Sequence, residues 1–330
     1  MSMITNIKMK RFNNLFEKIC DLNNLRIADL KARKGKIRSY GVRHHDLNRD
    51  NNIHELHKEL VKGTFKTSQY SVFDIVSDAG KKRTIYRLPY YPDRILHHAI
   101  LNILEPIWVS IFTSDTYSCI KNRGIHAIVR KLKRDIKDDN NTKYCLKLDI
   151  TKFYPSIDHE ILKQIIRKKI KDKRLLSLLD EIIDSAPGVP IGNYLSQFFA
   201  NIYLTYFDHY IKEVKKVKYY YRYADDIVIL HGERVYLHDI LNDIKTYFCE
   251  NLKLQVKSNY QVFPVQARGI DFVGYVFYHT HILLRKRIKQ NFAKYIKKHK
   301  CTIKQCPQYG WAIHCNSVNL IKTLSNERAI

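Results

Sequence analysis

The sequence predicts an α+β fold that centres on a split β-α-β sheet with helices on one face. The order of elements between Tyr144 and Val256 is the first observation: strand, helix, helix, hairpin, helix, strand. The hairpin itself is marked by "YYYRYADDIVIL", in which two apolar strands flank a polar turn. The chain has 330 residues and 45% hydrophobic content, which suffices for the cores of two or three lobes.

The chain before this region predicts helices and one pair of strands. Apolar residues recur at helical spacing in the first helix, and Gly63 ends the second. Two strands, "YSVFDIV" and "RTIYRLPYY", flank a polar turn within residues 64–91. The predicted helices in this part are 10–35, 50–62, 92–108 and 126–136.

The sheet region and the C-terminal part continue the alternation. "YCLKLDI" (144–150) predicts a buried strand, and "LKLQV" (252–256) predicts the strand that closes the sheet. "GIDFVGYVFYHTHILL" predicts a last hairpin, and from Lys286 onward the pattern is helical and very basic. The predicted helices in this part are 158–171, 173–184, 196–214 and 235–251.

The charge of the chain predicts a polyanionic partner. Lys plus Arg number 58 against 32 Asp plus Glu, which gives a net charge of +26. Between Phe272 and Asn326 there is no acidic residue but ten Lys or Arg. The 23 tyrosines and 14 phenylalanines are interleaved with the cations, which suits stacking on bases and binding of phosphates. Nucleic acid is therefore the first expected partner and an anionic membrane the second, although an AT-rich genome would also raise the Lys, Asn and Tyr counts.

The lack of a recognisable targeting signal and the dispersed cysteines predict a cytoplasmic protein without a membrane partner. No apolar run is long enough to span a bilayer, and the N-terminus lacks a secretory signal pattern. The seven cysteines are dispersed and form no CxxC pair, which is typical of reduced thiols. The spacing of the C-terminal Cys and His residues fits no standard zinc pattern, so a zinc site is only the alternative for them. That set is His299, Cys301, Cys306, His314 and Cys315.

Three aspartates are expected to converge at one edge of the sheet. Asp149 ends a strand, and Asp225 and Asp226 lie at the turn of the neighbouring hairpin. Carboxylates beside apolar strands need a compensating cation, and Mg²⁺ is a cation that prefers oxygen ligands. Two such ions about 4 Å apart bind the attacking and leaving oxygens of a phosphoryl transfer. We expect Asp149 and Asp225 as bridging ligands, with Mn²⁺ as an alternative to Mg²⁺. The Ile150 carbonyl would add a further ligand, and Asp226 a weaker one.

Each of these residues also has a structural explanation. Two adjacent aspartates in a turn are common, so "ADD" alone is also explained as a polar hairpin turn. Tyr154 follows Asp149 by five residues, where an aromatic ring can lie against the sugar of a nucleotide and exclude a 2′-hydroxyl by its bulk. Packing in the core is the alternative for Tyr154. The functional interpretation depends on these residues occurring together.

These segments, in this order and spacing, resemble the reverse transcriptases. "YADD" (223–226) is similar to the catalytic hairpin motif of that family, and "LKLDITKFYPSI" is similar to its first catalytic motif, with Tyr154 as the sugar gate. "GKKRTIYRLPYYPDRILHHAILNILEPIW" and "SCIKNRGIHAIVRKL" resemble finger segments of the bacterial enzymes. "GIDFVGYVF" looks like the primer-grip hairpin, and "QYGWAIHCNSVNL" resembles a thumb segment. The resemblance runs from about residue 60 to residue 322.

The resemblance implies a right-hand polymerase with fingers, palm and thumb, in which a ferredoxin-like antiparallel sheet forms the palm. It implies RNA-templated DNA synthesis, in which a primer 3′-hydroxyl attacks the α-phosphate of a dNTP with the help of two Mg²⁺ ions. Template RNA, the cDNA or primer and dNTPs are the implied partners. The implied segments are an N-terminal helical extension 1–60, fingers 61–143, palm 144–186, a nucleotide-pocket segment 187–200, a palm segment with both hairpins 201–284 and a basic helical thumb 285–330.

The resemblance also implies roles for residues other than the aspartates. The implied nucleotide-binding residues are Lys81, Arg83, Arg87, Tyr154, Ile191, Gly192 and Gln197. The implied nucleic-acid-binding residues are Arg123, Gly124, Gly274, Tyr275, Arg285, Lys286, Arg287 and Lys289. The basic residues near 285–300 have no acidic neighbours in the sequence, so we expect them to contact phosphates and to make binding steeply dependent on salt.

The stretch "IGNYLSQ" departs from the common form of the family. Most reverse transcriptases carry a glutamine where this chain has Ile191, and a proline where it has Gln197. This form resembles the enzymes of diversity-generating retroelements, bacterial or phage-borne systems that copy a template-repeat RNA into cDNA with errors opposite adenines. A glutamine amide helps to hold the templating geometry, whereas isoleucine offers only shape, although neutral drift would also explain Ile191. The subgroup implies a small basic accessory protein, often oligomeric.

Two other functions stay open on the sequence alone. A retron or antiphage-defence reverse transcriptase would apply the same chemistry to its own noncoding RNA, and a vestigial scaffold would bind nucleic acid without catalysis. Intact Asp149, Asp225 and Asp226 argue against the scaffold. Lys257 and Asn259 compete for the position of a general acid that protonates the leaving pyrophosphate in many relatives. Within the 330 residues we expect neither a maturase extension nor a fused RNase H, integrase or protease.

Overall fold

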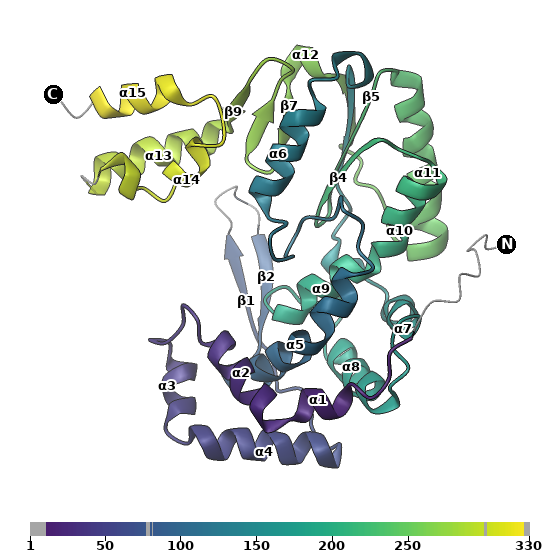
Figure 1. The fold of residues 1–330 in the computed structure, drawn as a ribbon, viewed down its shortest axis with the longest axis vertical. Coiled ribbons are helices and arrows are strands. Elements are labelled where there is room, and N and C mark those ends of the chain that lie inside the picture. Colours follow the sequence, from purple (N-terminus) through teal and green to yellow (C-terminus); the bar gives the residue numbers. More distant parts are fainter. Residues whose placement is uncertain (1–10, 77–79, 81, 300–301, 327–330) are drawn as a thin grey trace. The chain divides into compact units, whose positions relative to one another are not determined.

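The computed structural model describes residues 11–76, 80, 82–299 and 302–326, and the chain divides into two compact units (Figure 1). The first unit comprises the chain up to Phe112 together with Lys152–Tyr206 and Asn251–Leu254. The second comprises Thr113–Thr151, Phe207–Glu250 and the chain from Gln255 onward. The chain passes between the units several times, so neither unit is one continuous stretch of sequence.

The first unit begins with four helices. They are α1 (Phe16–Cys20), α2 (Leu22–Ala32), α3 (Tyr40–Asp46) and α4 (Arg49–Lys62). The single helix predicted over 10–35 is wrong, because the chain breaks at Asp21, whose side chain accepts a hydrogen bond from the Asn24 N–H and so caps α2. α4 ends as predicted, at Gly63, whose φ of 69° lies in the left-handed region.

The rest of the first unit packs around one buried helix. This helix, α5, has Leu96, Ile100 and Leu104 fully buried, and it lies against α2 and α9. β1 and β2 form the predicted antiparallel pair, and the helices predicted before and after Gly188 are present. The elements are β1 (Ser71–Val76), β2 (Lys82–Arg87), η1 (Tyr90–Arg94), α5 (Ile95–Val109), η3 (Tyr154–Ser156), α7 (His159–Arg167), α8 (Lys173–Asp184) and α9 (Tyr194–Tyr203).

The second unit is built on the predicted split sheet. Its four strands run in the order β4-β5-β3-β6 with every neighbouring pair antiparallel, which is the ferredoxin-like arrangement. The strands are β3 (Tyr144–Leu148), β4 (Tyr219–Tyr223), β5 (Asp226–His231) and β6 (Gln261–Pro264). The helices of this unit and of the connection to it are α6 (Ile125–Asp135), η2 (Asp139–Asn141), α10 (Thr205–His209), η4 (Tyr210–Val214) and α11 (Arg234–Leu252).

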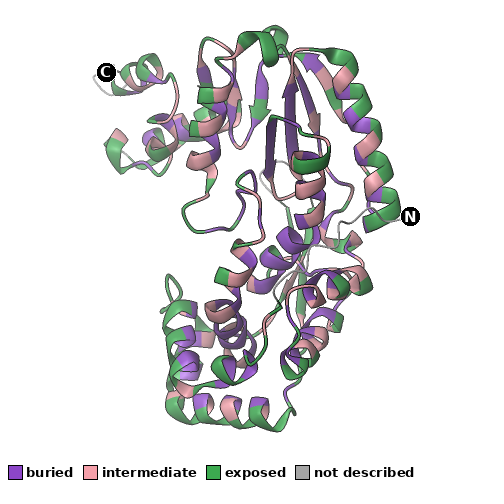
Figure 2. Cartoon of the chain, turned by 45° about the vertical axis from the view of Figure 1, so that its right-hand side comes forward, coloured by how far each residue is buried: buried purple, intermediate pink, exposed green. Residues whose placement is uncertain are grey.

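Both faces of this sheet are covered, where the sequence predicted helices on one face. β4 and β5 are buried along nearly their whole length, and Figure 2 shows them mostly in purple. Tyr221 belongs to a core that includes Leu132 of α6, whereas the ring of Tyr220, which points the other way, meets Phe207. Phe207 in turn packs on Phe248 of α11. Helices on both faces therefore hold the central hairpin.

The closing strand and the C-terminal part differ from the prediction. "LKLQV" forms no strand; Val256 makes only an isolated bridge to Ile150, and β6 lies further on. The predicted last hairpin is a three-stranded sheet of β7 (Ile270–Phe272), β8 (Tyr275–Phe277) and β9 (Ile282–Leu284). The remaining helices are α12 (Val265–Arg268), α13 (Lys286–His299), η5 (Ile303–Gln305), α14 (Tyr309–Ala312) and α15 (Val318–Asn326). Of the helices described, none has the length and apolar character needed to cross a membrane.

Candidate active site

The fold brings the three aspartates together, as predicted. Asp149 directly follows β3, whose last residue Leu148 pairs with Ile227 of β5. Asp226 is the first residue of β5, and Asp225 precedes it in the turn that connects β4 to β5. All three carboxylates thus lie at the same end of two neighbouring strands, within the second unit.

The electrostatics of this cluster show a deficit of positive charge. Burial and then the neighbouring carboxylate of Asp149 raise the pKa of Asp225 to about 7. Burial also raises the pKa of Asp226, although the ammonium of Lys147 partly opposes that shift. A carboxyl group that resists ionisation at neutral pH lacks a sufficient counter-charge. The cluster therefore has the character of a site that a cation would complete.

Lys257 supplies part of that charge. Its Nζ lies 2.9 Å from Oδ2 of Asp149, and its backbone N–H donates to the Asp149 carbonyl over the same distance. The hydrogen bond to Asp149 raises the pKa of Lys257, and Asp225 and Asp226 add to that shift. Of the two candidates from the sequence, Lys257 is the one in contact with the cluster, whereas Asn259 is exposed.

The donor atoms at this site suit a hard divalent ion. They are carboxylate oxygens, together with the backbone carbonyl of Ile150. In the Ile150–Val256 bridge, the Thr151 N–H donates to the Gln255 carbonyl and the Lys257 N–H donates to the Asp149 carbonyl. The Ile150 carbonyl takes no part in these two hydrogen bonds. In the described part of the chain, no three His, Cys, Asp or Glu side chains already stand at metal-ligand spacing. The fit therefore rests on the chemistry of the donors and on the raised pKa values.

A buried ion pair supports the turn that carries Asp225. The side chains of Arg222 and Asp208 are both fully buried, with Nη2 of the arginine 2.6 Å from Oδ2 of the carboxylate. Nη1 of Arg222 donates to the carbonyl of Ala224 over 3.1 Å, and Ala224 has a φ of 55°. The guanidinium thus fixes a residue in the left-handed region immediately before Asp225. Arg222 was not predicted as part of the site; a lone arginine within an apolar and aromatic strand was the available signal.

The predicted nucleotide-binding residues that the structure describes lie in the first unit, where the strand of Arg83 and Arg87 meets the stretch that carries Ile191 and Gly192. The Tyr86 N–H donates to the Ile191 carbonyl over 2.9 Å, which joins β2 to the "IGNYLSQ" stretch. At Gly192, with a φ of 123°, an added Cβ would lie 2.7 Å from the Tyr86 carbonyl oxygen, so glycine is required there. Arg83, Arg87 and Gln197 have exposed side chains. Lys81 lies outside the described residues.

Tyr154 is held by its backbone and is partly exposed. Its carbonyl accepts a hydrogen bond from the Val189 N–H, and Gly188 approaches that carbonyl so closely that an added Cβ would be 2.6 Å away. Its neighbour Phe153 is buried and meets the Tyr154 ring edge-on. Phe153 therefore takes the core position, which argues against core packing as the reason for Tyr154.

The predicted nucleic-acid residues divide into exposed and structural ones. Lys286 and Lys289 are exposed on α13. Tyr275 is fully buried and donates to the Trp311 carbonyl, so its prediction as a nucleic-acid contact is wrong. Gly274 is explained by packing, because an added Cβ would lie 2.5 Å from the Trp311 ring. Of the remaining predicted residues, Arg285 is paired with Asp271, and Arg287 is half-buried on α13. Arg123 donates to the Thr113 carbonyl, and Gly124 directly precedes α6.

The described members of the C-terminal Cys and His set do not form a cluster. Cys306 is buried in the core of the second unit, and Cys315 donates to the Ala312 carbonyl. The ring of His314 packs on that of His126, 4.0 Å between centroids. Cys301 lies outside the described residues. The zinc alternative therefore finds no support in the described residues.

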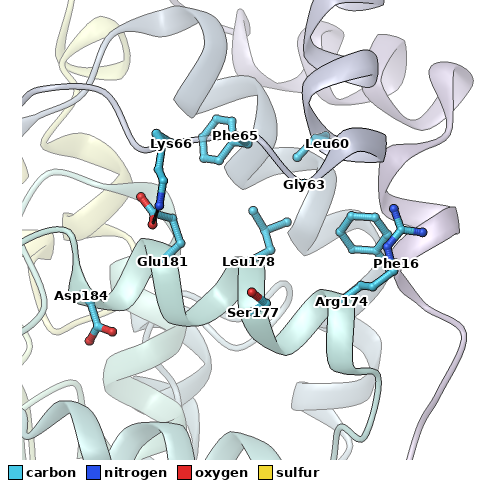
Figure 3. Close-up of a pocket in the computed structure, with 10 residues that line it drawn as sticks. All are labelled: Phe16, Leu60, Gly63, Phe65, Lys66, Arg174, Ser177, Leu178, Glu181 and Asp184. Carbon is cyan, nitrogen blue, oxygen red and sulfur yellow. Dashed lines mark hydrogen bonds and ion pairs between the residues drawn. The ribbon is translucent and has the colours of Figure 1, made fainter.

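A pocket of about 320 Å³ in the first unit contains none of the predicted site residues (Figure 3). Its apolar wall includes Phe65 and Leu178. Charged groups at its rim are paired: Lys66 lies 2.8 Å from Glu181, and Arg174 lies 2.7 Å from Glu17. We assign it no part in the chemistry of the aspartates.

The raised pKa of Asp225 predicts a pH-dependent stability of the metal-free protein. A folded-state pKa of about 7, above the ordinary 3.8, contributes stability that is complete below about pH 4 and lost as the pH rises through 7. The variant Asp225→Asn should therefore melt at a higher temperature than the wild type at pH 8 in a chelator, with a smaller difference at pH 5. Thermal unfolding followed by circular dichroism measures this, and the exposed Asp239→Asn is the control. A difference that does not change with pH would contradict the assignment.

Comparisons with known proteins agree with this geometry. The family described as "Reverse transcriptase (RNA-dependent DNA polymerase)" matches residues 66–277. Protein YkfC of Escherichia coli (strain K12) is 26% identical over 277 residues, which cover 70% of this chain and 71% of YkfC. The group II intron-encoded protein LtrA of Lactococcus lactis subsp. cremoris is 25% identical over 174 residues, which cover 49% of this chain but only 28% of LtrA.

The fold is similar to that of solved telomerases. Apo telomerase from Candida tropicalis gives a TM-score of 0.50 at 12% identity, covering 80% of this chain and 57% of that one. Telomerase from Candida albicans, solved with a fragment of telomeric RNA, gives 0.50 at 11% identity, covering 82% and 58%. This likeness shows the right-hand polymerase fold predicted from the sequence. The chain spans little more than half the length of these telomerases.

Proposed function

This chain belongs to the reverse transcriptase family of RNA-dependent DNA polymerases, and we propose that Asp149, Asp225 and Asp226 are its catalytic carboxylates. The observation that carries the proposal is the meeting of Asp149 and Asp225 at one end of β3 and β5, where burial and mutual repulsion raise the pKa of Asp225. A vestigial scaffold would have no need to keep such a costly arrangement. The reaction is attack of a primer 3′-hydroxyl on the α-phosphate of a dNTP, directed by an RNA template.

Each residue of the site has a part in this reaction. Asp149 and Asp225 would hold a pair of Mg²⁺ ions, with the Ile150 carbonyl as a further ligand and Asp226 as a weaker one. When bound, these ions lower the pKa of the primer hydroxyl and neutralise charge on the phosphates. Lys257 orients the Asp149 carboxylate through its ammonium group.

Lys257 also keeps a proton close to the site of reaction. Because Asp149 raises the pKa of Lys257, its Nζ stays protonated at neutral pH. That proton is available for the leaving pyrophosphate, and we propose Lys257 rather than Asn259 for this role. Arg222 acts on the reaction only through the backbone of the turn, by its bond to the Ala224 carbonyl.

Residues of the first unit would bind the incoming nucleotide. We propose Lys81, Arg83 and Arg87 for the triphosphate and Tyr154 for the sugar. The contact between Tyr86 and Ile191 supports a shared pocket, because it places the strand of the arginines beside the "IGNYLSQ" stretch. Gly192 and Gln197 are the remaining proposed members.

Divalent metal should be required for synthesis. With a primer annealed to an RNA template, dNTP incorporation should stop in excess chelator and return on addition of Mg²⁺ or Mn²⁺, because the carboxylates alone offer no Lewis acid. Incorporation of labelled dTTP on a polyadenylate template with an oligothymidylate primer measures this. A protein heated past its unfolding transition is the background control. Synthesis that persists in chelator would overturn the metal assignment.

Ile191 supports a more specific proposal, an error-prone enzyme of a diversity-generating retroelement. Its backbone is tied to Tyr86, so an apolar side chain occupies a fixed place where most of the family has an amide. A small basic accessory protein, a cytoplasmic location in a bacterium or in a phage-infected host, and template-repeat RNA belong to this proposal. A retron or defence enzyme would instead show a noncoding RNA without such repeats.

The variant Ile191→Gln tests the fidelity part of this proposal. Restoring an amide should lower misincorporation opposite template adenines by about tenfold, a difference of about 1.4 kcal/mol between right and wrong pairs. Sequencing of the cDNA measures the error at each template base, and Ile191→Val is the matched apolar control. Errors that are spread evenly over the four bases in the wild type would remove the adenine-mutagenic assignment.

A further inference from the structure

A basic and aromatic surface lies on the N-terminal helices, outside the part of the chain that the family match covers. It comprises exposed residues between α2 and α3, on α3 and at the C-cap of α3, and we call it the α2–α3 surface. Its members are Lys34, Lys36, Ile37, Arg38, Tyr40, Arg43, His44 and Leu47. The family match begins only at residue 66, so the shared domain does not account for this surface.

The surface exposes large side chains that a free surface seldom shows together. Every residue from Lys34 to Tyr40 is exposed. The exposed fractions are 81% for Tyr40, 65% for Ile37 and 76% for Leu47. An aromatic ring and two aliphatic chains within one short segment indicate a contact surface rather than an accident of composition.

The two acidic residues beside this surface, Asp29 and Asp46, already form ion pairs. Asp29 is fully buried and paired with Arg33 and Arg49. Asp46 is paired with the same Arg33. The four other cations, Lys34, Lys36, Arg38 and Arg43, make no ion pair with any acidic residue that the structure describes. The surface therefore carries uncompensated positive charge.

The segment is held in one conformation. Successive turns are closed by hydrogen bonds from the Lys36 N–H to the Arg33 carbonyl and from the Ser39 N–H to the Lys36 carbonyl. The ring of Tyr40 stacks on that of His44, 5.7 Å between centroids and 8° from parallel. The opposite side of α3 is anchored by His45, which is buried and stacks on Tyr91. The cations and the ring are thus presented together at little cost in entropy.

We propose that the α2–α3 surface binds single-stranded RNA, apart from the template and primer at the polymerase site. The four cations would contact phosphates, and a base would stack on the exposed face of Tyr40. An aromatic ring among unpaired cations is the combination that single-stranded nucleic acid selects. A membrane would require a continuous apolar face on a longer helix, whereas here the apolar chains alternate with charges and α3 has seven residues.

The experiment separates this surface from the polymerase site. The full chain is first saturated with a short unlabelled RNA–DNA hybrid, whose own affinity is measured separately. Binding of a labelled single-stranded oligouridylate is then followed by fluorescence anisotropy at several salt concentrations. In the variant with Lys34, Lys36, Arg38 and Arg43 changed to Gln, the slope of log affinity against log salt should fall by about 3, from four lost phosphate contacts. Tyr40→Ala should weaken binding by about tenfold.

A variant of equal charge provides the control. Lys18, Lys62, Lys171 and Lys173 are also exposed in the first unit, and changing all four to Gln removes the same charge elsewhere. The proposal holds if the control binds oligouridylate like the wild type while the α2–α3 variant does not, with equal primer extension in both. Equal losses in the two variants would show that net charge alone binds the RNA. Unchanged oligouridylate binding by the α2–α3 variant would also overturn the proposal. The same holds if, in a parallel assay, the variant loses only its binding to phosphatidylserine vesicles.

Failure of this proposal is distinguishable from failure of the proposed function. The affinity for the RNA–DNA hybrid and the rate of primer extension report on the polymerase site alone. If both are normal and oligouridylate does not bind the saturated chain, only the second RNA site is excluded.

Discussion

The variant Asp225→Ala should lose DNA synthesis on an RNA template almost completely, by at least about a thousandfold. Asp225 and Asp149 are the two carboxylates that would hold metal from neighbouring strands, and metal assistance is worth several kcal/mol, at about 1.4 kcal/mol for each factor of ten. Single-turnover extension of a primer on an RNA template measures the loss without interference from product release. The effect should lie in the rate of the chemical step rather than in the affinity for the hybrid.

Two controls make this result specific. Asp239→Ala removes a carboxylate from the exposed side of α11 and should leave the rate unchanged. A chain that has lost activity by unfolding is recognised by its melting curve, and Asp225→Ala should not be destabilised at neutral pH, because it removes a carboxyl with an elevated pKa. Wild-type activity in a folded Asp225→Ala protein would refute the catalytic assignment of Asp225, and a folded wild type that makes no DNA would leave a nucleic-acid-binding scaffold.

The variant Asp208→Asn should destabilise the second unit by about 3–5 kcal/mol. Asp208 accepts hydrogen bonds from Arg222, from the Tyr220 hydroxyl at 2.6 Å and from the Thr116 hydroxyl at 2.7 Å. Without its charge, Asp208 would no longer compensate the fully buried guanidinium of Arg222. Urea unfolding of the purified protein measures the change. The folded fraction should also polymerise more slowly, because the Ala224 carbonyl loses a fixed donor.

A double variant tests whether the buried charge is the cause. Asp208→Asn combined with Arg222→Met removes both charges, so it should be more stable than Asp208→Asn alone. The partly exposed pair of Lys215 and Asp243 is the matched control, and Asp243→Asn should cost no more than about 1 kcal/mol. An Asp208→Asn protein as stable as the Asp243→Asn protein would refute the prediction.

The central hairpin and its aspartates could be predicted because local pattern and fold agree there. "YYYRYADDIVIL" has the apolar strands and the polar turn that β4 and β5 require, and "YCLKLDI" forms β3 beside them. The position of Asp149 then follows from strand pairing. No such agreement exists for "LKLQV", whose alternating apolar residues suggest a strand. Leu252 and Leu254 are buried, but only Val256 bridges to a strand neighbour, because burial does not supply backbone partners.

Features that depend on distant partners could not be predicted. Arg222 is explained by Asp208, which lies on another element, and a sequence does not show that the two meet. Tyr275 suggested a nucleic-acid contact by its place in a motif, whereas Trp311, far along the chain, covers it.

The break at Asp21 depends on a cap, a local signal that periodicity alone did not reveal. The predicted contacts of Lys81 fall outside the described residues.

The burial of both faces of β4 and β5 has a consequence for how the enzyme loses its structure and activity under mild denaturation. Segments open locally in order of their stability, and strands buried on both sides and paired on both edges open last. β5 pairs with β4 on one edge and with β3 on the other. Asp149 and Asp226 are thus mounted on the part of this unit that mild denaturation reaches last. Partial unfolding of this unit would therefore leave the proposed catalytic carboxylates in place, and a chain damaged elsewhere in the unit would recover activity without rebuilding that site.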